Sequence, residues 1–128
     1  MSKQVKLKVN CLNILYLEGY ASDPATEIES KTSGEQRVLK FTLNHISLGK
    51  KQDDGTQVKY NTPFTVFVYG NRIDTVAPLV SNPLKLIMVE GKLRRVKGAG
   101  MVIIADFVKS TQPIVAEVTI EDTEEYHG

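Results

Sequence analysis

The sequence predicts an all-β domain, a small barrel of five strands with one short helix between the third and fourth strands. Apolar and polar residues alternate with a period of two over most of the chain. Glycine, proline, asparagine and aspartate separate the alternating segments. One segment instead has its apolar residues at helical spacing. The chain has 128 residues, of which 41% are hydrophobic, and this suits one domain with its own core.

The predicted strands differ in how clearly they alternate. The second places Leu39, Phe41 and Leu43 on one side, and these should point inward. We expect Asp23-Pro24 to end the first strand, and Asp54-Gly55 to form the turn before the third. The five strands are expected at residues 12–19, 37–48, 59–69, 84–96 and 101–109.

The predicted helix runs to Val80, with Asn71 as its cap. Pro78 lies inside it, so the helix should be short or kinked. The apolar residues at helical spacing are Ile73, Val76, Ala77 and Val80.

The charge is distributed unevenly along the chain. The net charge is +1, but the first 110 residues carry +6 and the last 18 carry −5. We therefore expect a folded domain at residues 1–110 and a C-terminal extension at 111–128 that ends in a short acidic tail. The extension contains a β-like stretch at residues 114–120. Its acidic run is either a solvated terminus or a functional tail.

Five strands with a helix after the third are the layout of the OB-fold barrel, although SH3-like barrels have similar strand counts. Short motifs then occur in an order that resembles the bacterial single-stranded DNA-binding proteins. The resemblance covers about residues 10–110 and implies an OB-fold, usually a homotetramer, that coats unpaired DNA without sequence preference. The motifs are Ile14-Leu15-Tyr16-Leu17 followed by Asp23-Pro24, then Thr32-Ser33-Gly34, then the strand 38–44, then the strand 64–70 ending in Tyr69-Gly70, and finally Val89-Glu90-Gly91-Lys92-Leu93-Arg94.

The chain also departs from this family. It has no tryptophan, and the positions of the family's tryptophans fall near Gly49, Pro63 and Gly98. The hairpin between the fourth and fifth strands is short. The end, Tyr126-His127-Gly128, lacks the family's flexible linker and acidic Pro-Phe tip. These differences suggest a divergent member, encoded by a phage or another mobile element.

Single-stranded nucleic acid is held by cations on its phosphates and by rings stacked on its bases. The cations expected to bind it include four within six positions of the fourth strand, of which Lys92 and Arg94 share one face and Arg95 and Lys97 the other. The full cationic set is Lys40, Lys50, Lys51, Lys59, Lys92, Arg94, Arg95 and Lys97.

The expected stacking residues are Phe67, Tyr69 and Tyr60. Matching to the family places Phe67 and Tyr69 on the outward face, because Val66 and Val68 suit the interior better. The alternative is that Phe67 belongs to the core and Phe64 is exposed. Tyr60 either stacks or closes the barrel. We expect Tyr16 to be a core residue, and Arg72 to pair with Asp74 or a neighbouring chain.

The residue inventory argues against an enzyme, a cofactor or a metal site. The chain has no Gly-rich phosphate loop with Lys-Ser/Thr, and its one cysteine and two histidines are too few for a zinc site. No long apolar run suggests a membrane segment or a secretory signal, so a cytoplasmic location is expected, either nucleoid-associated or in the host of a phage.

The expected partners are single-stranded DNA, further copies of this chain in a tetramer or dimer, and replication or recombination proteins. The expected role is protection of DNA during replication, recombination or repair. The alternatives are an OB-fold adaptor that binds proteins of the replication machinery, because tryptophan is missing and the net charge is modest, and an RNA-binding OB protein.

Overall fold

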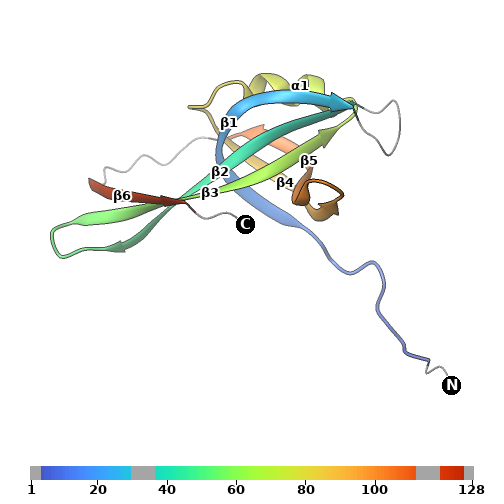
Figure 1. The fold of residues 1–128 in the computed structure, drawn as a ribbon, viewed down its shortest axis with the longest axis horizontal. Coiled ribbons are helices and arrows are strands. Elements are labelled where there is room, and N and C mark those ends of the chain that lie inside the picture. The colour runs from blue at the N-terminus through green and yellow to red at the C-terminus, as the bar shows by residue number, and fades with distance from the viewer. Residues whose placement is uncertain (1–3, 30–36, 112–118, 126–128) are drawn as a thin grey trace.

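A computed structural model describes residues 4–29, 37–111 and 119–125 (Figure 1). It contains one helix and six strands. They are β1 (Leu15–Glu29), β2 (Arg37–Lys51), β3 (Thr56–Tyr69), α1 (Arg72–Val80), β4 (Leu86–Val96), β5 (Gly100–Ser110) and β6 (Thr119–Glu125). The prediction of a mainly β fold with one helix between the third and fourth strands is confirmed. Within the described ranges, no helix has the length and apolar character needed to cross a membrane.

Five strands are joined into a closed ring of backbone pairings. β1 pairs with β2 and β4, β2 with β3, and β4 with β5, all antiparallel. A short parallel pairing of β3 with β5, at Val66–Ile103 and Phe67–Ile104, closes the ring. The order around the ring is therefore β1-β2-β3-β5-β4, and the inner face of each strand points towards a common core.

The core follows the alternation seen in the sequence. Leu39, Phe41 and Leu43 of β2 are 4%, 2% and 0% exposed, as predicted. Val66 and Val68 of β3 face them and are fully buried. The helix packs against this core through Ile73, Val76 and Val80, with Ala77 partly buried beside them.

Asn71 occupies the N-cap position of α1, but its side chain makes no capping hydrogen bond. The predicted cap position is therefore correct and the predicted capping bond is wrong.

Several predicted strand boundaries differ from the structure. β1 begins at Leu15 rather than at residue 12, and β2 continues to Lys51 rather than ending at residue 48. The end of β1 and the start of β3 differ because each strand is longer than its alternation. β1 does not end at Asp23-Pro24 but continues to Glu29, with an irregularity in its pairing to β2 between Ser22 and Thr26. A bulge lets a strand pass residues that cannot join the ladder. β3 begins at Thr56, earlier than expected, because its polar first residues still pair with β2.

β2 and β3 extend beyond the ring as a long hairpin, and β6 lies along it (Figure 1). The hairpin turns at Gly55, where φ is +89°, and the Asp54 carboxylate accepts hydrogen bonds from the Thr56 N–H (3.0 Å) and hydroxyl (2.6 Å). The predicted Asp54-Gly55 turn is confirmed.

β6 contains most of the acidic run and pairs in parallel with β3 over Thr56–Asn61. The backbone of residues 119–125 is therefore part of a strand. The predicted turn at residues 32–34 and residues 112–118 lie outside the described ranges.

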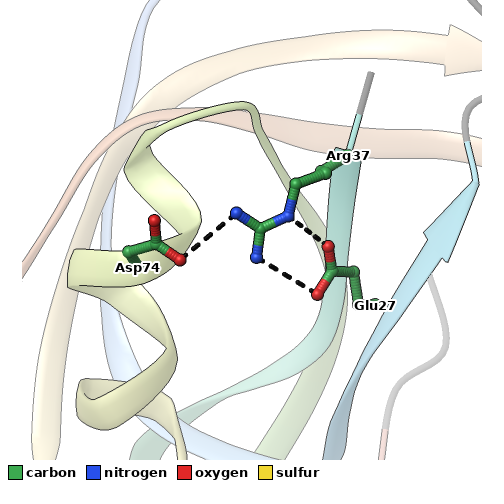
Figure 2. A network of polar contacts seen from close by, with 3 residues as sticks. All are labelled: Glu27, Arg37 and Asp74. Atoms are coloured by element: carbon green, nitrogen blue, oxygen red, sulfur yellow. Dashed lines mark hydrogen bonds and ion pairs between the residues drawn. The ribbon is translucent and has the colours of Figure 1, made fainter. Parts of the chain in front are cut away.

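Arg37 joins three elements at the helical end of the ring (Figure 2). Its guanidinium donates through Nε and Nη2 to the Glu27 carboxylate of β1, and Nη1 lies 3.3 Å from Asp74 Oδ1 of α1. Asp74 thus pairs with Arg37 rather than with Arg72. The two hydrogen bonds between Arg37 and Glu27 lower the pKa of the Glu27 carboxyl group and raise the pKa of Arg37.

We expect the contribution of Glu27 to stability to be lost in acid. Its pKa is lowered in the folded chain, so its stabilising effect is present above the pKa of the unfolded state, about 4.3, and fades as pH falls through the lower folded value. The substitution Glu27→Gln should lower the melting temperature at neutral pH, and the difference from the parent should shrink towards pH 3. Because these side chains are exposed, the effect should be small. A difference that stays constant with pH would contradict the assignment.

Candidate nucleic-acid interface

A row of side chains crosses four strands on the outer side of the ring. Lys40 of β2 lies opposite Phe67 of β3, Phe67 opposite Ile104 of β5, and Ile104 opposite Lys92 of β4. Directly opposed residues in a sheet share one face. Because Val66, Val68 and Ile103 occupy the core, this row points outward. We call the surface built on this row and its neighbours Tyr69 and Arg94 the β3 face.

The centre of the β3 face is a second apolar cluster, separate from the core. Val38, Phe67, Val102 and Ile104 are between 1% and 7% exposed and pack together. Tyr69 and Val96 lie partly buried against them. An apolar cluster with its own buried members makes a firm base, because its side chains are held by several neighbours at once.

Phe67 therefore requires a correction. It lies on the outer side of β3, as predicted, and Phe64 packs against the core. However, its ring is only 5% exposed, because the neighbouring apolar side chains of β2 and β5 cover it. Phe67 supports the β3 face from below and does not offer its ring for stacking.

Tyr69 is the ring that remains partly accessible on this face. It packs edge to face against Phe67, with 6.4 Å between ring centroids and an interplanar angle of 76°. It pairs across the ladder with Val38. The contact with Phe67 holds one edge of the tyrosine, so the orientation of its ring is fixed before any ligand arrives.

Cations flank the cluster. Lys40 and Arg94 are exposed and Lys92 is half-buried, and Arg94 lies opposite Val102 of the cluster. None of these three forms an ion pair with an acidic residue in the described part of the chain. A central apolar strip with a partly exposed ring and unpaired cations on both sides suits an extended polyanion with flat bases.

The other predicted cations of β4 do not join this arrangement directly. Arg95 lies opposite Met101 and, by the alternation of the strand, on the other side of the ladder from Arg94. Lys97 is exposed in the turn between β4 and β5. Only Lys92 and Arg94 of this predicted group lie on the β3 face.

The predicted residues of the long hairpin lie far from the row. Lys59 shares the parity of Phe67, but eight residues separate them, about 26 Å along an extended strand. Its segment also pairs with β6. Lys50 and Lys51 are exposed near the tip. The ring of Tyr60 lies against Gly49, where an added Cβ would be 2.8 Å from a ring carbon, so this ring packs on its own hairpin.

Three members of the cluster under this face, Val38, Val102 and Ile104, were not predicted to belong to the site. The segment from Val102 to Ala105 is apolar at every position, and all four side chains are buried. Such an uninterrupted apolar run is typical of a strand that is covered on both sides. That signal, taken with Phe67 across the ladder, could have revealed the second cluster.

Among the residues placed by the structure, no three histidine, cysteine or acidic side chains gather where they could hold a metal ion. No protein-family model and no curated protein matches the chain.

Solved structures do match it. One is a deletion mutant of the single-stranded DNA binding protein from Thermus aquaticus, with a TM-score of 0.59 and 18% identity over 79% of this chain and 51% of that chain. Another is the protein PriB from Ralstonia solanacearum, with a TM-score of 0.59 and 13% identity over 80% of this chain and 100% of that chain. A second PriB structure from the same organism gives 0.58 and 12%. The chain therefore has the fold that a single-stranded DNA binding protein and PriB share.

Proposed function

We propose that this chain is a divergent, OB-fold member of the bacterial-type single-stranded DNA-binding proteins. It binds and protects unpaired DNA with little sequence preference during replication, recombination or repair, in the cytoplasm, and it catalyses no reaction. The observation that carries the proposal is the β3 face, where Tyr69 and the cations Lys40, Lys92 and Arg94 surround one buried apolar cluster. The likeness in fold to the Thermus aquaticus protein supports it.

On this proposal the phosphates contact the flanking cations and a base stacks on Tyr69. Both interactions are independent of base identity, because every nucleotide has a phosphate and a flat ring. Binding releases counterions from the strand, so the affinity should fall steeply with salt.

The direct test is a titration with oligo-dT at low salt. The chain has five tyrosines and no tryptophan, so quenching of tyrosine fluorescence reports binding without a background from indoles. We expect a dissociation constant below ~10 μM at low salt, given the strong electrostatic contribution. No binding in that range would contradict the proposal and would favour a protein-binding adaptor. A parallel titration with oligo-rU decides between DNA and RNA.

The substitution Tyr69→Ala should weaken oligo-dT binding by about 1–3 kcal/mol, the usual value of one stacked base. The loss should be similar for dT and dC oligomers, because stacking reads no sequence. Fluorescence anisotropy of a labelled oligomer is the suitable measurement, since it does not depend on the protein's tyrosines. Tyr69→Phe keeps the ring and serves as the matched control, with an affinity close to that of the parent. Equal losses in both variants would exclude stacking at this position.

We also propose that the chain works as a homo-oligomer, a dimer or a tetramer. Mass measurement in solution, with and without oligo-dT, tests the assembly and its dependence on the ligand together. A monomer under both conditions would contradict this part of the proposal.

A further inference from the structure

The N-terminal arm (residues 4–12) precedes β1 and has no secondary structure. Its apolar residues Val5, Leu7 and Val9 are 70–76% exposed, and they alternate with Lys6 and Lys8. Strict alternation of this kind is typical of a strand that buries one side. Against the described residues of its own chain the arm buries neither side, so its sequence fits a partner that those residues do not supply.

The arm leaves the ring at a defined point. The Asn13 side chain donates to the Leu93 carbonyl at 2.7 Å and accepts from the Leu93 N–H at 3.0 Å, so this residue is tied to the edge of β4. Asn10 then has a left-handed backbone, with φ of +56°. Beyond this bend the arm runs away from the body (Figure 1).

A second surface also lacks a partner. We call it the β1 face: in one row Tyr16 lies opposite Glu90 and Glu90 opposite Phe107, and in the next Glu18 lies opposite Met88 and Met88 opposite Lys109. Leu15, Leu17 and Val89 between them pack into the core, so this face points outward. Tyr16 and Phe107 are 60% and 63% exposed, which corrects the expectation that Tyr16 is a core residue.

The arm, the β1 face and the segment that joins them contain most of the exposed large apolar residues in the described part of the chain. In the described part of the chain twelve large apolar side chains are exposed, and seven belong to the arm, to the β1 face or to the segment that joins them. They are Val5, Leu7, Val9, Leu12, Ile14, Tyr16 and Phe107. Contiguous exposed apolar surface in a water-soluble domain marks an interaction site more often than it marks chance.

The arm and the β1 face are complementary in charge as well as in polarity. The arm presents two lysines and no acid, and the β1 face presents Glu18 and Glu90 with one cation, Lys109, at its corner. Tyr16 lies opposite Glu90 in the ladder, and this carboxylate raises the pKa of Tyr16 through hydrogen bonding and its negative charge. The apolar side of the arm therefore matches the exposed rings of the β1 face, and its two lysines attract the arm to a face that carries two carboxylates.

The dimensions agree. Six extended residues span about 20 Å, whereas three neighbouring strands are about 10 Å across. Residues 4–9 are thus long enough to cross the face. The arm continues the direction of β1 away from its own sheet, so a neighbouring copy can receive it without a reversal of the chain.

We propose that the N-terminal arm of one copy lies across the β1 face of a second copy, and that the exchange is reciprocal. Val5, Leu7 and Val9 cover Tyr16 and Phe107, whereas Lys6 and Lys8 lie on the opposite side of the extended arm and stay in water. A two-fold axis makes both contacts identical, as in most homodimers. The inference rests on the self-association proposed above and not on DNA binding.

Cross-linking between two marked chains tests the contact. Both carry Cys11→Ser, because Cys11 is the only cysteine and is exposed. One also carries Leu7→Cys, and the other carries Phe107→Cys and an affinity tag. Mild oxidation of the mixture should give a disulfide-linked pair of unequal chains. Leu84→Cys, whose parent leucine is 86% exposed on a loop, replaces Leu7→Cys as the matched control and should give little of this product.

Two results would overturn the exchange. One is a pair that forms no faster than the Leu84→Cys control. The other is a disulfide within one chain when Leu7→Cys and Phe107→Cys are combined, which would show that the arm covers its own β1 face.

Mass measurements in solution distinguish the arm exchange from the broader proposal that the chain self-associates. If the parent chain is an oligomer, replacing Val5, Leu7 and Val9 by serine should raise its dissociation constant at least tenfold, and Leu84→Ser should not. An oligomer that is unaffected by the arm substitutions would refute the exchange and leave self-association standing. A monomeric parent would refute both.

Discussion

Replacing Gly91 by alanine is expected to destabilise the fold by at least about 3 kcal/mol, near the upper end for one substitution. Gly91 is buried where β4 pairs with β5, and an added Cβ would lie 2.2 Å from the Ile104 carbonyl oxygen. A backbone oxygen cannot rotate away, so the two strands would have to separate at the point where Ile104 also supports the β3 face. Urea denaturation followed by circular dichroism measures the loss.

Gly49→Ala is the matched control for this experiment. Its added Cβ would approach the far end of the Tyr60 ring, at 2.8 Å, and a side chain can move. The expected cost is about 1 kcal/mol or less, since a rotated ring relieves most of the overlap. If the two variants unfold at the same urea concentration, the close approach of β4 to β5 is not what requires glycine at position 91.

Replacing Lys40 and Lys92 together by glutamine is expected to weaken oligo-dT binding by roughly 50–100-fold at about 50 mM salt. These residues stand at the two ends of the row that crosses the β3 face. Each phosphate contact on a single strand contributes about 0.7 to the slope of log affinity against log salt, so the slope should fall by about 1.4. Anisotropy titrations at several salt concentrations give both quantities.

A double variant of equal charge provides the control. Lys50→Gln with Lys51→Gln removes two cations that are exposed near the tip of the long hairpin, far from the row. This variant should keep the parent's slope to within a few tenths. If the two double variants lose the same affinity, the binding depends on net charge alone, and the β3 face is not the site.

The strands that alternate cleanly could be predicted from the sequence, because one side of each meets a core and the other meets water. β2 is the best example, since Leu39, Phe41 and Leu43 were all predicted to be buried. The rest of β1 could not be predicted, because Asp23-Pro24 normally ends a strand and only the pairing with β2 carries the chain past it. The pairing of the acidic β6 with β3 is equally a tertiary effect, in which an available edge outweighs local composition.

The candidate site was predicted in part. Matching to the family, with Val66 and Val68 assigned to the interior, placed Tyr69 and Phe67 outside the core, and the parity of β4 placed Lys92 and Arg94 on one side. The apolar run from Val102 to Ala105 indicates a strand that is covered on both sides, but only the closed ring shows that Val102 and Ile104 cover Phe67. For the same reason the distance from Lys59 to the row became visible only with the strand register.

The second apolar cluster also has a thermodynamic consequence. Four of the side chains under the β3 face are already buried in the free chain, so a nucleic acid that binds there buries little additional apolar surface. The heat-capacity change on binding depends on that burial and should therefore be small and negative. The enthalpy of binding should then change little with temperature, so a plot of the logarithm of the affinity against reciprocal temperature should be nearly straight.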